Sequence, residues 1–155
     1  MDTIDTIAST ATKASIETTA TKASIVSTFI MSYKKLQIGQ LSRTLVIDIH
    51  EMSLKLPSFE GFEVGSQIRR SIKSVKSNIV ESYGRRRYKK EYIRFIIFAL
   101  SSNDETIDHL ETLLETKSMK NEKLYADLHQ RLNILGIKIN NFSKSIEKHH
   151  DKFEE

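Results

Sequence analysis

Hydrophobic residues recur at steps of three and four along most of this chain, a spacing that places them on one side of an α-helix. The pattern predicts four long helices, over about residues 33–56, 64–83, 88–117 and 122–148. In the fourth helix the spacing is close to that of a coiled-coil seam. The expected core positions in the first, second and fourth helices are Ile38, Leu41, Leu45, Ile49, Met52, Leu56, Ile68, Ile72, Val75, Ile79, Leu124, Leu128, Leu132, Leu135, Ile139, Phe142 and Ile146.

The connections between these helices are short. Pro57 stops the first helix, and because Gly61 and Gly65 follow it, residues 57–65 are expected to form a turn. Gly84 is expected to end the second helix as a left-handed residue. Since short connections make neighbouring long helices antiparallel, the predicted fold class is all-α, an antiparallel up-down-up-down four-helix bundle.

The predicted third helix carries apolar residues on two adjoining stripes. One stripe holds Tyr92, Phe95, Ile96, Ala99, Leu110 and Leu113, and the other holds Ile93, Ile97, Leu100, Ile107 and Leu114. A helix with so wide an apolar surface is either central or covered on a second side by another subunit. Since a four-helix bundle has no central helix, we expect another copy of the chain to cover it.

Residues 1–30 differ in composition from the rest of the chain. The sequence TATKASI occurs at 10–16 and again at 19–25. Such a Thr-, Ala- and Ser-rich segment buries too little apolar surface to offset its ordering entropy, so we expect a disordered or weakly helical extension. Met31 directly precedes the first patterned segment, and we hypothesise that the natural protein starts there. The predicted bundle domain is then 31–150, followed by a charged tail at 151–155.

Composition excludes several classes of chemistry. The 155 residues include no cysteine, which removes disulfides, thiolate nucleophiles and thiolate zinc sites. No apolar run approaches the roughly 20 residues that span a bilayer, so we expect a soluble, cytoplasmic protein without a membrane partner. Since neither a nucleotide-binding glycine loop nor a Ser-His-acid arrangement is evident, we expect no enzymatic activity and no cofactor.

The histidines invite a search for a metal site. They are His50, His109, His129, His149 and His150. A di-iron bundle needs Glu-x-x-His on two helices and further carboxylates that point inward. Only Glu147 and His150 have this spacing, close to the charged C-terminus, so we expect no metal.

Positive charge is concentrated between Gln67 and Arg94. This stretch holds ten basic and two acidic residues, a net charge of +8, whereas the whole chain carries +4. A local basic patch on a near-neutral protein is typical of a polyanion binder, because each neutralised phosphate releases counterions. The alternative is a charged face that only keeps the protein in solution. The predicted nucleic-acid-binding residues are Arg69, Lys73, Lys76, Arg85, Arg86, Arg87, Lys89, Lys90 and Arg94.

A second group of polar residues lies beside the apolar stripes of the second and third helices. Because half-buried charges must be paired, we interpret it as a buried or interfacial network that links Arg70 with Glu81 or Glu105. The alternative is a small-ligand pocket. The residues of this predicted polar network are Gln67, Arg70, Ser74, Asn78, Glu81, Ser102 and Glu105.

One stretch of the chain carries a family resemblance. It reads LPSFEGFEVGSQIRRSIKSVKSNIVESYGR and then KKEYIRFIIFALSSNDE, with marker residues at Pro57, 67–70, Ser74, 78–82 and 99–105. With these residues the chain resembles a bacterial four-helix bundle family first noticed as proteins encoded in intervening sequences of 23S ribosomal RNA genes. The resemblance extends from about Tyr33 to the end of the fourth helix. The departures from the family pattern are Val80, Ser82 and Ser101, where it has small Ala and Gly, and Gly39, where it often has an aromatic residue.

The resemblance implies a ring-like homopentamer. It also implies similarity to the pentameric accessory protein of diversity-generating retroelements, which binds nucleic acid through a basic surface. We therefore hypothesise a non-enzymatic oligomeric bundle that binds RNA or DNA, largely without sequence specificity. The alternative is a structural adaptor that recruits a protein partner, such as a polymerase or a ribosomal component, through the same arginines.

Overall fold

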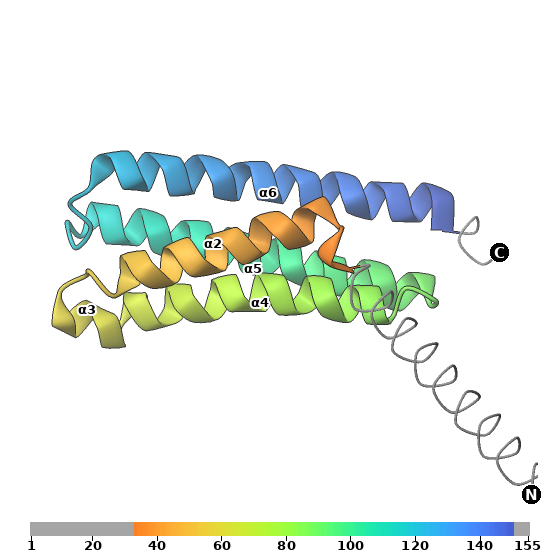
Figure 1. Cartoon of the computed structure of the whole chain (residues 1–155), viewed down its shortest axis with the longest axis horizontal. Coiled ribbons are helices and arrows are strands. Elements are labelled where there is room, and N and C mark those ends of the chain that lie inside the picture. Colours follow the sequence, from red (N-terminus) through yellow and green to blue (C-terminus); the bar gives the residue numbers. More distant parts are fainter. Residues whose placement is uncertain (1–32, 151–155) are drawn as a thin grey trace, which may run out of the picture. The chain divides into compact units, whose positions relative to one another are not determined.

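The computed structural model describes residues 33–150, and the bundle is built from the part that starts at Leu36 (Figure 1). The predictions for residues 1–30, for Met31 and for the tail at 151–155 lie outside the described residues. The helices are α2 (Gln37–Ser53), α3 (Ser58–Phe62), α4 (Val64–Gly84), α5 (Lys89–Glu115) and α6 (Glu122–His149).

The four long helices pack as an antiparallel up-down-up-down bundle, which confirms the predicted fold class. The principal contacts join α2 with α4, α4 with α5, α5 with α6, and α6 with α2, so each long helix lies between two neighbours. The α2–α4 and α5–α6 connections lie at one end of the bundle, and the α4–α5 connection lies at the other (Figure 1). Residues 85–88 therefore occupy an end of the bundle and not its side.

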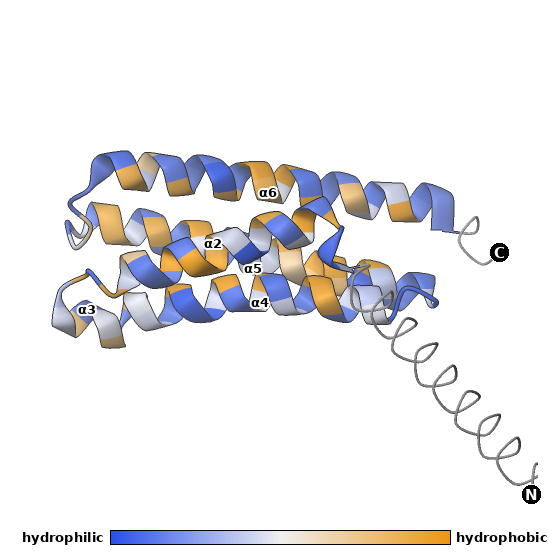
Figure 2. Ribbon diagram, in the orientation of Figure 1, coloured by the Kyte–Doolittle hydropathy of each residue, from blue (hydrophilic) through white to orange (hydrophobic). Residues whose placement is uncertain are grey.

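The apolar stripes form a single core between the four long helices. Ile68, Ile72, Val75 and Ile79 of α4 and Leu128, Leu132, Leu135 and Ile139 of α6 are fully or almost fully buried. Burial of one such side chain contributes about 1.5–3 kcal/mol to the hydrophobic driving force. Figure 2 shows apolar and polar residues alternating around each long helix, as the sequence pattern predicts.

The wide apolar surface of α5 is explained mainly within the chain. Ile93, Leu100 and Ile107 of its second stripe pack against the core, because α5 lies between α4 and α6. Only Ile97 of that stripe is an exposed large hydrophobic residue among the described residues, and Phe98 is exposed beside it. Coverage of this helix by another copy of the chain stays a prediction, and Ile97 and Phe98 are the exposed apolar residues of α5 that such a contact would bury.

The turn between α2 and α4 contains the short helix α3, which the sequence pattern missed. The first turn of α4 lies so close to α3 that a Cβ atom on Gly65 would come within 2.5 Å of the Glu60 carbonyl oxygen. Arg69 of α4 donates hydrogen bonds to Ser53 Oγ at 3.1 Å and to the Gly61 carbonyl oxygen at 2.9 Å. This end of the bundle is thus held by the close packing of α3 against α4 and by the hydrogen bonds of the Arg69 guanidinium group.

Polar contacts also cross between the long helices. Thr106 of α5 donates to Ser71 Oγ of α4 at 2.8 Å, and Asn103 Nδ2 donates to the Leu132 carbonyl oxygen of α6 at 3.1 Å. All these polar atoms lie in the buried interior, where a hydrogen bond is stronger than it is in water. The core is therefore apolar except for a few hydrogen bonds that connect α5 with α4 and α6.

The opposite end of the bundle is closed by aromatic contacts. Tyr92 packs edge-on against Phe142 at 5.9 Å and against His150 at 6.4 Å between ring centroids. His150 is only 3% exposed, and its Nε2 donates to the Arg86 carbonyl oxygen at 2.7 Å, since a carbonyl can only accept. The end of α6 thereby holds the α4–α5 connection in place.

Gly84 does not adopt the left-handed conformation that we predicted. No described glycine has a positive φ, and α4 extends to Gly84 with Arg85 as its C-cap at φ −98° and ψ 9°. Because Arg85 N already bonds the Glu81 and Ser82 carbonyl oxygens, the helix ends without a left-handed residue. The only positive φ of a non-glycine among the described residues belongs to Lys117, at 60° after α5.

Gly65 and Gly84, which lie near the two ends of α4, should respond oppositely to replacement by alanine. A Cβ on Gly84 would meet nothing within 4 Å, so Gly84→Ala is expected to stabilise the fold by about 0.5–1 kcal/mol through the unfolded chain. Gly65→Ala should destabilise it by about 1–3 kcal/mol, because α3 must move. Urea unfolding of both variants measures the two values, and a destabilised Gly84→Ala protein would contradict the assigned backbone conformation.

Burial raises the pKa of Tyr92 to about 12 from its ordinary value of 10.0; Tyr83 adds to the rise and Arg86 opposes it. Between these two values the unfolded chain loses the phenol proton while the folded chain keeps it. Stability should therefore fall as pH rises through this interval, by about 1.4 kcal/mol per pH unit from this group. Urea unfolding of the wild type and of Tyr92→Phe at several pH values above 9 checks this, and equal pH dependence would contradict it.

Candidate nucleic-acid interface

The densest cluster of cations lies where α4 passes into α5. We call it the basic junction, and its residues are Arg85, Arg86, Arg87, Lys89, Lys90 and Arg94. Its backbone is tightly hydrogen-bonded: Arg86 N donates to the Tyr83 carbonyl oxygen, Tyr88 N to that of Arg85, and Tyr92 N to that of Tyr88. Because backbone hydrogen bonds connect the turn with both α4 and α5, its side chains project from an ordered backbone.

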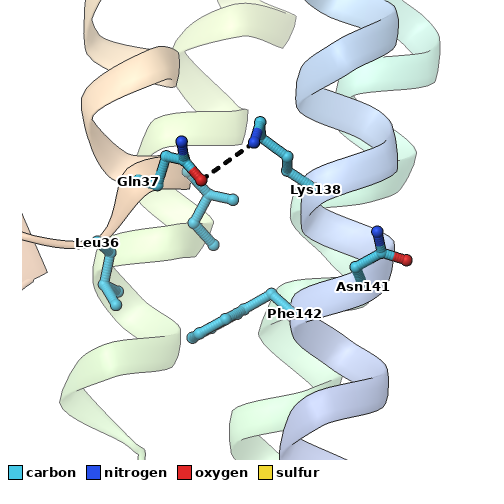
Figure 3. Close-up of a pocket in the computed structure, with 6 residues that line it drawn as sticks. Leu36, Gln37, Lys138, Asn141 and Phe142 are labelled. Carbon is cyan, nitrogen blue, oxygen red and sulfur yellow. Dashed lines mark hydrogen bonds between the residues drawn. The ribbon is translucent and has the colours of Figure 1, made fainter.

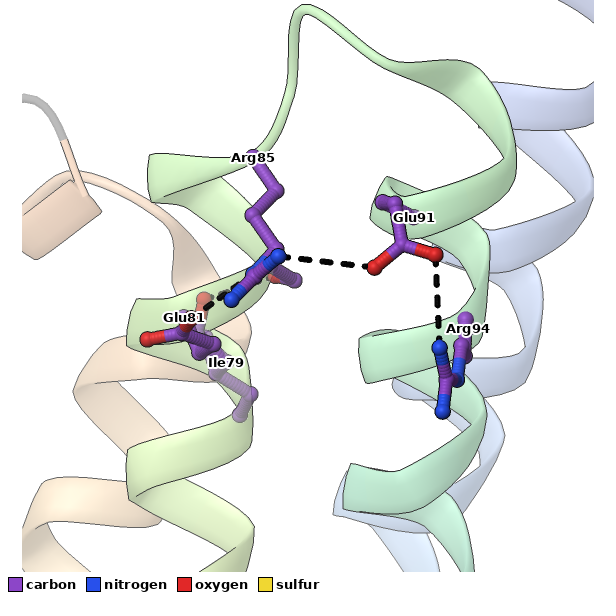
Figure 4. A network of polar contacts seen from close by, with 6 residues as sticks. Ile79, Glu81, Arg85, Glu91 and Arg94 are labelled. Carbon is purple, nitrogen blue, oxygen red and sulfur yellow. Dashed lines mark hydrogen bonds and ion pairs between the residues drawn. The ribbon is translucent and has the colours of Figure 1, made fainter.

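Arg85 and Arg94 are partly neutralised by carboxylates of α4 and α5 (Figure 4). Arg85 Nε lies 2.7 Å from Glu81 Oε1, and Glu91 approaches Arg85 at 3.5 Å and Arg94 at 3.4 Å. The arginine side chains are 46% and 60% exposed, and surface ion pairs of this kind contribute about 0–1 kcal/mol. Such weak pairs can be exchanged for contacts with a phosphate.

Two of these guanidinium groups also lie over aromatic rings of α5. Arg85 lies 4.8 Å from the ring centroid of Phe95, and Arg94 lies 5.4 Å from that of Phe98. Cation–π contacts of this kind orient the guanidinium but leave its charge in place. Two arginines of the basic junction are thus each positioned by a phenylalanine ring of α5.

Arg86 is the most constrained arginine of the junction. Its Nη1 donates to the Tyr83 carbonyl oxygen at 2.9 Å, and its guanidinium lies 4.3 Å from the Tyr83 ring centroid. Its own carbonyl oxygen accepts from His150. Arg86 therefore positions the turn in addition to carrying charge.

Arg87 and Lys90 are the accessible cations of the junction. Both side chains are exposed, and neither forms an ion pair or a hydrogen bond within the described part of the chain. Lys89, at the start of α5, is half-buried. A ligand can thus reach Arg87 and Lys90 without first displacing a carboxylate of residues 33–150.

The remaining predicted cations lie on α4. Lys73 and Lys76 are exposed and face the same flank of the helix, because they are three residues apart. Arg69 continues this flank one turn earlier, but its guanidinium is bonded to Ser53 and Gly61. We therefore assign Arg69 to the scaffold, and Lys73 and Lys76 to the accessible basic surface.

The segment that carries the basic junction has a net positive charge. From Glu81 to Arg94 the sequence holds six basic and two acidic residues. Within residues 33–150, Glu81 pairs with Arg85, and Glu91 pairs with both Arg85 and Arg94. This charge lies at one end of the bundle.

The predicted polar network is divided in the structure. Its centre joins α4 and α5 through Ser74 Oγ and Ser102 Oγ at 2.9 Å, and Asn78 Nδ2 donates to Ser74 Oγ at 3.1 Å. Glu81 pairs with Arg85 instead, and Glu105 lies 3.4 Å from His109.

Arg70, which we expected to link these acids, joins neither of them. Arg70 and Gln67 are exposed, and their side chains have no hydrogen-bond or ion-pair partner within residues 33–150. Of the departures from the family pattern, Ser82 is buried and donates to the Ile79 carbonyl oxygen, whereas Val80 and Ser101 are exposed. Neither exposed residue crowds a helix of its own chain.

A small cleft lies elsewhere, between the start of α2 and α6 (Figure 3). It has a volume of about 270 Å³, and Lys138 Nζ donates to Gln37 Oε1 across it at 3.1 Å. Its lining residues are Leu36, Gln37, Ile38, Lys138, Asn141 and Phe142. No residue of the predicted polar network lines this cleft.

The histidines have separate environments. His129 Nε2 lies 2.8 Å from Glu111, His149 contacts the Ser145 carbonyl oxygen, and His150 donates to Arg86. Within the described residues, no group of three or more His, Asp or Glu side chains is placed to hold a metal ion. In that same part of the chain, no helix combines the length and apolar character that crossing a membrane requires.

Sequence reasoning missed the aromatic and histidine contacts of the junction. Tyr83 and Tyr88 flank the three arginines in the sequence, so their interleaving with cations was a usable signal. His150 left no such signal, because 64 residues separate it from the Arg86 carbonyl that it contacts.

Comparisons with known proteins place this geometry in a family. A search among solved structures finds a crystal structure from the S23 ribosomal protein family of Bacteroides thetaiotaomicron, with 20% identity and a TM-score of 0.50. The match covers 67% of this chain and 98% of the other, and at this identity it supports the fold alone.

A comparison with curated proteins finds no match. The family described as 23S rRNA-intervening sequence protein matches residues 34–141, which span α2 to most of α6. With most of the chain matched and with the helical bundle in common, this protein belongs to the 23S rRNA-intervening sequence protein family.

Proposed function

We propose that this protein is a non-enzymatic nucleic-acid-binding bundle that contacts RNA or DNA phosphates through the basic junction. The observation that carries the proposal is the exposure of Arg87 and Lys90 without a carboxylate partner in residues 33–150. Fixed, accessible cations release counterions when they meet a polyphosphate, which favours binding at low salt. Lys73 and Lys76 extend the same surface along α4.

The shape of the surface favours binding without sequence specificity. Most of the cations stand at the α4–α5 turn, at one end of the bundle (Figure 1), where a protein meets phosphates more readily than base edges in a groove. Phosphate contacts position a protein but carry no sequence information. Assembly into a ring of five, which the resemblance implies, would repeat the surface and raise avidity.

Reversing the accessible charges tests this proposal. The double variant Arg87→Glu with Lys90→Glu should lose roughly tenfold or more in affinity for a labelled oligonucleotide, and the magnitude of its salt slope should fall by about two. Fluorescence anisotropy across a salt series measures both quantities.

A matched control is available at the other end of the bundle. Lys120 and Lys123 are exposed beside the α5–α6 connection, and Lys120→Glu with Lys123→Glu changes the net charge equally. This control should keep most of the affinity. Wild-type protein that fails to bind at low salt, or equal losses in both double variants, would contradict the proposal. An adaptor would instead lose a protein partner in pull-downs while its nucleic-acid binding stayed unchanged.

A further inference from the structure

The aromatic side chains around the basic junction are not equivalent. The Tyr83 ring lies under Arg86, the Phe95 and Phe98 rings contact each other and two arginines, and Tyr92 is packed against Phe142 and His150. Tyr88 is different. It is 65% exposed, and within the described part of the chain its side chain has no ring, cation or hydrogen-bond partner.

The backbone of Tyr88 is nevertheless fixed. Its N–H donates to the Arg85 carbonyl oxygen at 2.9 Å, and its carbonyl oxygen accepts from Tyr92 N at 2.8 Å. Tyr88 is the N-cap of α5 in an extended conformation. The aromatic ring is thus presented to solvent from an ordered backbone, so a ligand that stacks on it has to order only the side chain.

The neighbours of Tyr88 are the accessible cations. Arg87 precedes it directly, and Lys90 follows in the first turn of α5. A flat ring with an accessible cation on either side of it in the sequence matches the chemistry of an unpaired nucleotide, which offers a base face and flanking phosphates together. A duplex offers the phosphates but hides its base faces in the stack.

We propose that the basic junction selects single-stranded nucleic acid, with Tyr88 as the platform on which one unpaired base stacks. This inference rests on the proposed function and specifies its ligand. The phosphate contacts of Arg87 and Lys90 serve single strands and duplexes alike, whereas the contact of Tyr88 serves only a strand with free base faces. Stacking on an aromatic side chain tolerates any base, which agrees with binding that ignores sequence.

Anisotropy titrations with single strands and duplexes test the inference. The probes are oligothymidine and oligouridine of about 16 nucleotides and a DNA duplex of the same length. Tyr88→Ala should weaken binding to both single strands by about tenfold and leave duplex binding unchanged. Tyr88→Phe should keep wild-type affinity, because stacking needs the ring and not the hydroxyl group.

A control variant separates stacking from general loss of an exposed aromatic residue. Phe62 of α3 is 89% exposed at the other end of the bundle, and Phe62→Ala should bind every probe as the wild type does. Unchanged single-strand affinity of Tyr88→Ala, or equal losses for single strands and duplex, would overturn the role of Tyr88 while the basic junction remained a phosphate site. Failure of the wild type to bind any probe at low salt would instead overturn the proposed function itself.

Discussion

The mutual burial of four apolar stripes is the constraint on which the structure depends. Each long helix has one face that must leave water, and a square of antiparallel helices buries all four faces at once. Antiparallel order then sends the α4–α5 connection to an end of the bundle, away from the core (Figure 1). Residues of this connection do not pack in the core, so charged side chains there have little effect on the stability of the fold.

The electrostatic character of the junction follows from this placement. Repulsion among six neighbouring cations is reduced by solvent, by Glu81 and Glu91, and by the aromatic rings under three of the arginines. His150 adds a hydrogen bond to the backbone from the last turn of the chain's final described helix. The turn is therefore rigid where its charge is highest, because contacts from three helices hold it.

The helices and the core were predictable, because hydrophobic spacing is a property of the sequence alone. The predicted stripe residues Ile68, Ile72, Val75 and Ile79 of α4, and Leu128, Leu132, Leu135, Ile139 and Ile146 of α6, are buried as that spacing requires. Features that depend on distant residues were not predictable. The binding of Arg69 to Ser53 and Gly61 removed one cation from the expected interface, and a close approach of α3 gave Gly65 its role. Gly84 misled us because a glycine after a helix is common as a left-handed cap, whereas here Arg85 makes the turn.

The contact between Asn103 and Leu132 has a consequence for how α5 and α6 are aligned. The leucine seam of α6 repeats regularly, so sliding it along α5 by two turns would again bring leucines against apolar side chains. Gly136 lies directly opposite Asn103, and a Cβ there would approach Asn103 Nδ2 to 3.1 Å. Because α6 contains no other glycine, a slipped alignment would bring a residue with a Cβ against Asn103. A single asparagine beside a glycine therefore favours the native pairing over slipped ones that hydrophobic packing alone would tolerate.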